Sequence, residues 1–505
     1  MKAFTSLLTC VGLFAFFSSV TAEVEPIEIK GSHFFYKNGT AFFVRGIRYE
    51  PFGYELSNFN PPPDPLGSGI LCRRDIPYLS GFNINVIVVA YIDRDKDHSE
   101  CVNALADAGI YVVPQVDAGV NSYLYVWNQE TFEYKIGIIS SLANYSNVLA
   151  FRMTAAGQQP TDLLYFRAAF RDMRTYMSEV LHRSIPIVLS ILPEEQEKDT
   201  IDYIWCHDDA ADIVQLWMGN SVINCTSDQN IEDAVDFAKS LSGPIVLEGM
   251  RCDLYIGEFD DRNYEFTYDV YSDKGAAALS GGILDTYYGD WNESMTFAIM
   301  VLRFEPNNEN AIEPLAGAMS LSSVLAAAKP SFTNEAQYNP TTITRSCPTG
   351  SEWAFSGVLP PRAYEPLCSC MLNTLQCTAK LGAVETLSDS MMYMTLLDAC
   401  GPDREKDCGA IVTNSTTGKY GAYSMCDRTT VYSWVANHYW QTGGKCDLNG
   451  TAELRDAQQM PQGDCKFLLD QVGAAGEKTL TAFLGANTAS STAPHPVART
   501  KLTAS

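Results

Sequence analysis

The sequence predicts an α/β fold in which a (β/α)8 TIM barrel is followed by a small, disulfide-rich, mainly α module. Short apolar runs alternate with segments of helical periodicity along the first two thirds of the 505 residues. Eight cysteines crowd into the segment from Cys368 to Cys465. The first pattern is typical of a parallel barrel, and the second of a small domain that disulfides stabilise.

Eight runs are expected to form the barrel strands. Each is mainly apolar, and continuous apolar runs are what strands that are buried on both faces require. The helix between the second and third strands is indicated by "DHSECVNALADAG", which has an acidic start at Asp97 and a stop at Gly109. In such a barrel the chemistry lies where the strands end. The runs begin at Phe42, Asn85, Ile110, Asn147, Ile185, Asp212, Pro244 and Gly281.

The ends of the chain differ in composition from its middle. Residues 1–22 contain a lysine, an apolar run and small residues before Ala22, which predicts a secretory signal peptide. The barrel is expected over 23–345, a Pro-rich linker over 346–366, the module over 367–470 and a disordered polar tail over 471–505. No further apolar run is long enough for a transmembrane segment, and this C-terminus lacks the apolar stretch of a GPI signal, so no anchor is expected.

Charge and cysteine content restrict the class of protein. The 35 basic and 60 acidic residues give a formal charge of −25, which argues against nucleic acid as a partner. Fourteen cysteines after the signal peptide and six N-x-S/T sequons predict a secreted, extracellular glycoprotein. The sequons are at Asn38, Asn144, Asn224, Asn292, Asn414 and Asn449.

Metal and cofactor motifs are absent from the sequence. Its six histidines lack the spacing of metal ligands, and no P-loop or G-x-S-x-G occurs. "CHDD" from Cys206 is interpreted as a disulfide cysteine beside an acidic turn, with metal ligands or a Cys/His pair as the alternatives. We therefore expect no metal and no cofactor.

Several stretches together carry a family resemblance. "KGSHFFYKNGTAFFVRGIRYEP", "CRRDIPYLSGFNINVI" and "RAAFRDMRTYM" resemble fungal β-1,3-glucanosyltransferases of glycoside hydrolase family 72. "LCSCMLNTLQC" resembles the start of the eight-cysteine glucan-binding module of carbohydrate-binding family 43. The resemblance implies bridges Cys72–Cys101, Cys206–Cys347 and Cys225–Cys252. It also implies four bridges within the module, among Cys368, Cys370, Cys377, Cys400, Cys408, Cys426, Cys446 and Cys465.

The chemistry that the resemblance implies is retaining glycosyl transfer, in which an acid and a nucleophilic carboxylate lie about 5–5.5 Å apart. The family pattern N-x-L-x-F-x-x-G-N-E, laid on the sequence from Asn147, puts Ala156 at the acid. The nucleophile pattern puts Gly249 at the second glutamate, with Glu248 one residue away. An offset of one residue turns a strand side chain to the opposite face unless a bulge re-aims it. No intact catalytic residue is therefore expected.

Other site residues remain candidates with two interpretations. Glu248 is either a displaced nucleophile or a structural carboxylate, and Glu50 and Asp285 could form an unrelated acid pair. Tyr49, Glu50 and Asp285 at the barrel mouth are candidate substrate contacts. In the module, Tyr432 and Trp434 are candidates for stacking on glucose rings, and the alternative is that they fill its core.

These observations lead to three functional hypotheses. In the first, the chain is a secreted cell-wall protein, a pseudoenzyme that binds β-1,3-glucan or another wall polysaccharide, or organises the wall. In the second, it is an active β-1,3-glucanosyltransferase that remodels wall glucan with Glu248 as nucleophile. In the third, the altered barrel mouth binds a different ligand or a protein.

Overall fold

The structure is a computed structural model, and it describes most of the chain outside its two ends. The described residues are 24–49, 63–118, 127–155, 159–191, 197–217, 229–241, 243–250, 264, 267–289, 299–305, 308–340, 346–385, 387–401, 407–455 and 461–484. The predicted signal peptide, the end of the predicted tail, Glu50, Ala156, the sequons at Asn224 and Asn292, and Cys225 and Cys252 lie outside them.

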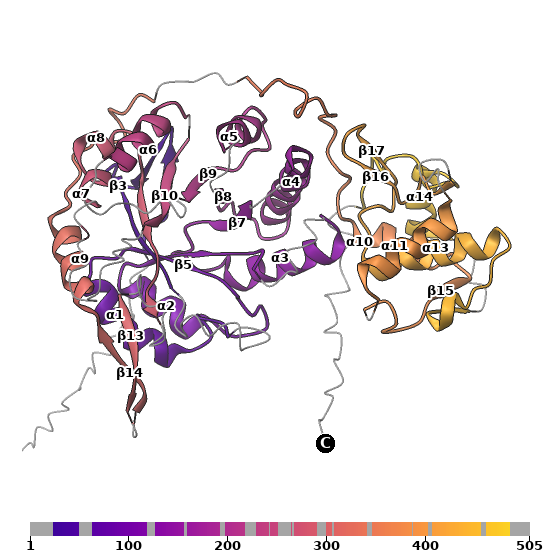
Figure 1. The fold of residues 1–505 in the computed structure, drawn as a ribbon, viewed down its shortest axis with the longest axis horizontal. Helices are drawn as coiled ribbons and strands as arrows, with labels where there is room; N and C mark the ends of the chain where they lie inside the picture. The colour runs from indigo at the N-terminus through magenta and orange to yellow at the C-terminus, as the bar shows by residue number, and fades with distance from the viewer. Residues whose placement is uncertain are drawn as a thin grey trace, which may run out of the picture.

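Eight parallel strands form the barrel, which confirms the predicted fold class (Figure 1). Their order in the sheet is β6-β5-β4-β11-β10-β9-β8-β7. Parallel bridges Val112↔Val148 and Gln115↔Arg152 join β6 to β7 and close the ring. The strands are β4 (Val44–Arg48), β5 (Val86–Val89), β6 (Tyr111–Pro114), β7 (Phe151–Ala155), β8 (Ile187–Ile191), β9 (Ile213–Trp217), β10 (Ile245–Met250) and β11 (Gly281–Leu284).

Helices surround the barrel because each strand also carries apolar side chains on its outer face. In β7, for example, Phe151 and Met153 belong to the cluster shared with the helices, whereas Ala150, just before this strand, belongs to the barrel interior. The helices are α1 (Gly69–Gly81), α2 (Ser99–Asp107), α3 (Gln129–Leu142), α4 (Leu163–Glu179), α5 (Glu197–Trp205), α6 (Gln229–Lys239), α7 (Thr267–Val270), α8 (Asp273–Ala276) and α9 (Ala316–Ala327), with a 3-10 turn η2 (Pro160–Asp162) before α4.

A short antiparallel sheet closes the bottom of the barrel. It consists of β1 (Ile27–Lys30), β2 (His33–Tyr36) and β3 (Ala41–Phe42). Phe34 and Phe42 from this sheet pack on the interior side chains of the barrel, including Val86 and Val88. Because this end is filled with apolar side chains, ligand access is restricted to the opposite end, where the strands finish. A further sheet of β12 (Tyr288–Gly289), β13 (Met300–Glu305) and β14 (Asn308–Pro314) follows β11.

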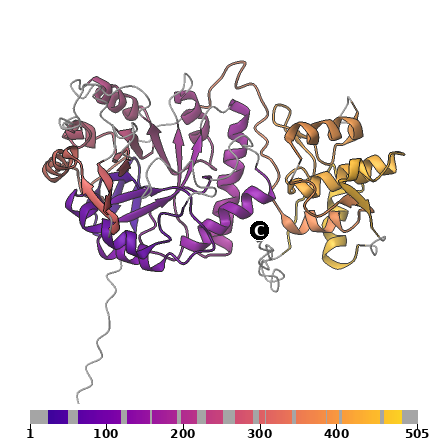
Figure 2. The same cartoon turned by 60° about the horizontal axis from the view of Figure 1, so that its bottom comes forward.

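The C-terminal region is a small disulfide-rich unit beside α3 and α4, as Figures 1 and 2 show. Its bridges are Cys368–Cys426, Cys370–Cys465, Cys377–Cys446 and Cys400–Cys408, and the barrel contains Cys72–Cys101 and Cys206–Cys347. Its elements are α10 (Glu365–Leu372), β15 (Cys377–Ala379), α11 (Asp389–Cys400), β16 (Thr413–Asn414), β17 (Lys419–Tyr420), α13 (Arg428–Gln441), η3 (Leu448–Gly450), β18 (Ala452–Leu454) and α14 (Gly463–Val472).

The segment between the barrel and the module, expected to be a linker, contacts both. Its Ser356 amide donates to the carbonyl of Thr416 in the module at 2.9 Å. Trp353 and Phe355 contact the Tyr203 ring, with ring centroids 5.3 and 5.4 Å away. Arg171 of α4 donates a 3.0 Å hydrogen bond to the Pro360 carbonyl. Beyond α14, where a disordered tail was expected, Phe483 packs edge-on against the ring of Tyr364. No helix in the described ranges is long and apolar enough to cross a membrane.

Candidate active site

The fourth barrel strand brings no carboxylate to the mouth. β7 ends at Ala155, which is 5% exposed and packs with the outer apolar cluster. Ala156, at the position of the family's acid, follows immediately outside the described residues. Neither alanine side chain can donate or accept a proton.

The seventh barrel strand carries a bulge at the position of the family's nucleophile. The register of β10 against β11 shifts between Leu247 and Met250, and Gly249 lies in between with a φ of +70°. A Cβ atom built on Gly249 would lie 3.0 Å from the ring of Trp217. An L side chain here would therefore meet both a left-handed backbone and an indole ring, so this position favours glycine.

Glu248, the residue before the bulge, points into the barrel. It is fully buried and has the same strand parity as Val246 in the barrel interior. Arg152 of β7 donates to its Oε1 at 2.6 Å, and the Ser190 hydroxyl donates to its Oε2 at 2.6 Å. Glu248 faces inward by the regular alternation of β10, so the expectation that a one-residue offset turns this side chain away from the barrel does not hold.

The Arg152 guanidinium is the centre of a polar layer across the barrel. Its Nε donates to Gln215 at 2.9 Å, its Nη1 to Gln115 at 2.5 Å and its Nη2 to Ser190 at 2.9 Å. Arg152 is only 5% exposed, so its charge is compensated by Glu248 in a site from which water is largely excluded. Each residue comes from a different strand or, for Gln115, from directly after one.

The surroundings of Glu248 bear on its candidate role as a nucleophile. A retaining enzyme needs a carboxylate oxygen that can reach the anomeric carbon of the sugar. Both Glu248 oxygens accept short hydrogen bonds, and no part of the side chain reaches solvent. The arrangement fits the alternative interpretation, a carboxylate that neutralises a buried arginine.

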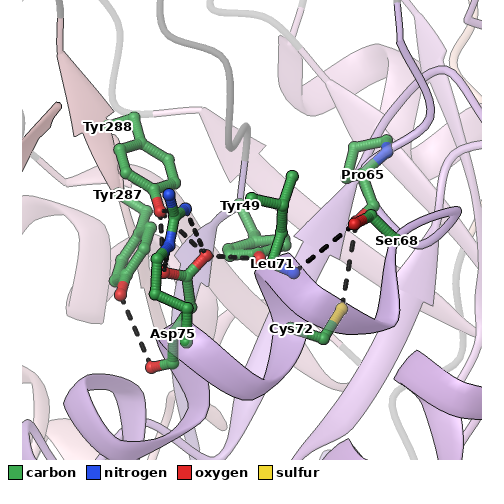
Figure 3. A network of polar contacts seen from close by, with 9 residues as sticks. Tyr49, Pro65, Ser68, Leu71, Cys72, Asp75, Tyr287 and Tyr288 are labelled. Atoms are coloured by element: carbon green, nitrogen blue, oxygen red, sulfur yellow. Dashed lines mark hydrogen bonds and ion pairs between the residues drawn. The ribbon is translucent and has the colours of Figure 1, made fainter. Parts of the chain in front are cut away.

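Tyr49, a predicted substrate contact, belongs to a buried network at the side of the mouth (Figure 3). It is 1% exposed, and its hydroxyl donates to Asp75 Oδ2 at 2.7 Å. The Tyr288 hydroxyl donates to both Asp75 oxygens at 2.8 Å, and Arg74 Nε donates to Oδ1 at 2.8 Å. Burial and then the Asp75 charge raise the pKa of Tyr49 well above its usual value. Tyr49 therefore ties the first strand to α1, and its burial argues against contact with substrate.

Asp285, the third candidate at the mouth, pairs with an arginine. Its carboxylate lies 3.3 Å from Nη1 of Arg48, and the Arg48 guanidinium lies over the Trp217 ring at 5.6 Å. These side chains come from the ends of the first, sixth and eighth strands, so they cover part of the mouth. The acid pair proposed between Asp285 and Glu50 has one member outside the described residues.

The aromatic candidates of the module separate into two groups. Tyr432 is 2% exposed and its hydroxyl lies 2.6 Å from that of Thr451, so it is a core residue. Trp434 is half-buried and stacks on His438 with parallel rings and centroids 5.1 Å apart. Of these two candidates, Trp434 alone keeps exposed ring surface for a sugar.

One group of possible metal ligands occurs among the described residues. Ligand atoms of Cys206, His207 and Cys347 lie within 4.8 Å of one another. Because the two cysteines are joined in a disulfide, neither offers a thiolate. This arrangement supports the interpretation of "CHDD" as a disulfide cysteine beside an acidic turn.

Three important polar residues were not predicted from the sequence. Arg152 interrupts an apolar strand, and that interruption was an available signal. Asp75 lies in the middle of α1, where nothing in the local sequence indicates that its carboxylate is buried. Asp117 follows β6, and its Oδ2 accepts a hydrogen bond from the Thr154 amide at 2.7 Å.

Comparisons with known proteins agree with this architecture. Residues 16–303 match the glucanosyltransferase family model, and residues 375–453 match the X8 domain. A 1,3-beta-glucanosyltransferase of Arthroderma benhamiae is 30% identical over 95% of this chain and 92% of its own length. The 1,3-beta-glucanosyltransferase gas1 of Schizosaccharomyces pombe is 29% identical over 93% of this chain and 86% of its own.

A solved structure extends the similarity to the whole fold. Saccharomyces cerevisiae Gas2p in complex with laminaripentaose superimposes with a TM-score of 0.73 at 23% identity, over 86% of this chain and 98% of that one. The family model covers more than half of the chain, and the relatives match along nearly all of it. The chain therefore belongs to the glucanosyltransferase family and carries a C-terminal X8 domain.

Proposed function

We propose that this protein is a secreted cell-wall member of the glucanosyltransferase family that does not catalyse glycosyl transfer and instead binds β-1,3-glucan or organises the wall. The observation that carries the proposal is the state of Glu248, which is fully buried and bonded to Arg152 and Ser190. General acid catalysis alone contributes about 100- to 10,000-fold, and a missing nucleophile removes the covalent route entirely. Two lost carboxylates therefore leave a barrel without the family's reaction.

Secretion and glucan binding are supported by other features. Disulfides and exposed sequons at Asn38, Asn144 and Asn449 fit an extracellular glycoprotein. The related Gas2p has been solved with laminaripentaose, a β-1,3-linked glucose oligomer. Half-buried Trp434 provides an aromatic surface that suits the apolar face of a glucose ring.

The test is a transfer assay combined with a binding measurement on the same preparation. We expect the purified mature protein to leave reduced laminari-oligosaccharides unchanged in length, while calorimetry detects binding of laminaripentaose. Longer or shorter products would overturn the loss of catalysis. If products form, Glu248→Gln distinguishes the displaced-nucleophile mechanism from another route, and Glu453→Gln on exposed β18 is the matched control. Circular dichroism shows whether each variant is folded.

A further inference from the structure

One disulfide of the barrel differs from the other described bridges in its exposure to solvent. Cys206 and Cys347 are both half-buried. Every other bridge that the structure describes has at least one buried cysteine, and both cysteines of Cys72–Cys101 are only 1% exposed. A thiol exchanges with a disulfide only where it can reach a sulfur atom, and exposed bridges are the labile ones. Cys206–Cys347 is therefore the described bridge that is most open to a reductant.

A histidine side chain faces this bridge. His207 follows Cys206 directly, and its Nε2 lies 3.8 Å from the Sγ of Cys347, a distance at which sulfur can accept a hydrogen bond. The imidazole packs edge-on against the ring of Tyr203, with ring centroids 5.1 Å apart, which holds it beside the sulfur. With a proton on Nε2, the imidazole can donate to a thiolate that forms at Cys347. Because a stabilised thiolate leaves faster, this arrangement favours Cys347 as the leaving sulfur.

The bridge also fixes the start of the segment between the barrel and the module. Shortly after Cys347, Trp353 and Phe355 pack on the ring of Tyr203, which lies at the end of α5. The next residue, Ser356, donates a backbone hydrogen bond to the module. The bridge joins positions that are 141 residues apart, so it is a long-range covalent tie. Once the bridge is open, only non-covalent contacts hold this part of the segment on the barrel.

We propose that Cys206–Cys347 is a site of thiol–disulfide exchange with a soluble dithiol, and that the bridge controls how firmly residues 346–366 are held on the barrel. A thiolate of the dithiol attacks the Sγ of Cys206, the bond between the two bridge sulfurs breaks, and its electron pair leaves on the Sγ of Cys347 beside His207. The second thiol of the dithiol then attacks the mixed disulfide. The dithiol is oxidised to a disulfide, the bridge is reduced by two electrons, and the two protons of the dithiol end on the two cysteines.

Differential alkylation during reduction by dithiothreitol tests the site in the full-length mature protein. Free thiols are labelled with N-ethylmaleimide over time and located by peptide mass spectrometry. We expect Cys206 and Cys347 to be labelled about tenfold faster than Cys72 and Cys101, because the latter bridge is shielded from the thiolate. The exchange requires neither a glucan nor catalysis by the barrel, so its outcome is independent of the proposed function.

A pair of histidine variants tests the assistance to the leaving sulfur. His207→Ala should be reduced about tenfold more slowly than the wild type, because the departing Cys347 sulfur loses a hydrogen-bond donor. His182→Ala, the same change at an exposed histidine, is the matched control and should be reduced at the wild-type rate. Both variants keep every cysteine, so the bridge can form in each, and circular dichroism checks that each is folded.

Limited proteolysis tests the effect of the bridge on the segment. Chymotrypsin cleaves after aromatic residues, and both Trp353 and Phe355 are half-buried against the barrel. We expect cleavage after these residues to become faster once Cys206–Cys347 is selectively reduced and alkylated, while the far-ultraviolet circular dichroism of the protein stays unchanged.

Three results would overturn the inference. Labelling of Cys206 and Cys347 that is no faster than labelling of Cys72 and Cys101 would mean that the bridge is closed to thiols. Equal reduction rates for His207→Ala and the wild type would mean that the imidazole does not assist the leaving sulfur. Equal chymotrypsin cleavage before and after reduction would mean that the bridge does not hold the segment. If His207→Ala is unfolded, the order of labelling in the wild type and the cleavage rates decide.

Discussion

Replacing Glu248 by glutamine should destabilise the protein severely. The substitution keeps the shape of the side chain but removes the charge that compensates Arg152, which is 5% exposed. Glutamine also offers only one acceptor oxygen where Arg152 and Ser190 each donate to a carboxylate oxygen. Breaking a buried pair by removing one partner costs about 3–5 kcal/mol. That is a large share of the roughly 5–15 kcal/mol by which a domain is stable.

A double-mutant cycle separates the energy of the Arg152–Glu248 interaction from the effect of changing each side chain alone. Replacing both partners of a buried pair by apolar residues is often neutral or stabilising. We therefore expect Arg152→Met with Glu248→Met to be more stable than Glu248→Gln alone, with a coupling energy within the range of about 0.5–3 kcal/mol seen for contacting residues. Urea denaturation followed by tryptophan fluorescence and circular dichroism measures all the variants.

Two results would refute this account of the barrel interior. One is a Glu248→Gln variant whose free energy of unfolding lies within about 1 kcal/mol of the wild type, because an uncompensated buried arginine should destabilise the protein by more than that. The other is additivity of the two methionine substitutions, which would mean that Arg152 and Glu248 do not interact. Lys239→Met, which breaks an exposed ion pair, is the control and should change stability by less than about 1 kcal/mol.

Three further predictions concern the backbone, the tyrosine network and pH. In urea denaturation, Gly249→Ala should lower the free energy of unfolding more than Gly382→Ala does. Both glycines have positive φ, but only at Gly249 would a new Cβ contact an indole ring. Equal losses of stability would mean that the contact with the indole has no effect. In the same assay, Tyr49→Phe should lower the free energy of unfolding by about 1.5–3 kcal/mol, because it removes a hydrogen bond to the charged Asp75. An unchanged midpoint of unfolding would show that this hydrogen bond contributes nothing. Burial lowers the pKa of His33 in the folded state, so the contribution of His33 to stability is complete above its unfolded pKa of 6.5 and falls as the pH drops below that value. His33→Gln should flatten this part of the curve of unfolding free energy against pH. An identical slope in the variant would mean that His33 does not cause the pH dependence.

The barrel could be predicted because its signal is local. Runs such as "VIVV" from Val86 are apolar at every position, and a strand buried on both faces is the structure that accommodates them. The direction of Glu248 could not be predicted in this way. Glu248 faces inward with Val246 because side chains alternate along a strand, and the sequence did not indicate that the register shift at Gly249 lies after it.

The candidate site was harder to predict than the fold because its residues meet over long separations. Tyr49 is aromatic and lies at a strand end, which suggested contact with sugar, but its partner Asp75 is 26 residues away in the chain. Glu248 and Arg152 are 96 residues apart. The interruption of an apolar strand by Arg152 indicated a buried charge, although nothing in the local sequence indicated which acid would neutralise it.

The register shift at Gly249 also limits which residues this position can accept. A side chain at 249 would have to occupy a left-handed backbone and would press on the Trp217 ring, whose other neighbour is the Arg48 guanidinium. A larger residue at 249 would therefore disturb a contact that joins the ends of the first and sixth strands. Variation at this position is expected to be limited to glycine unless residue 217 changes with it.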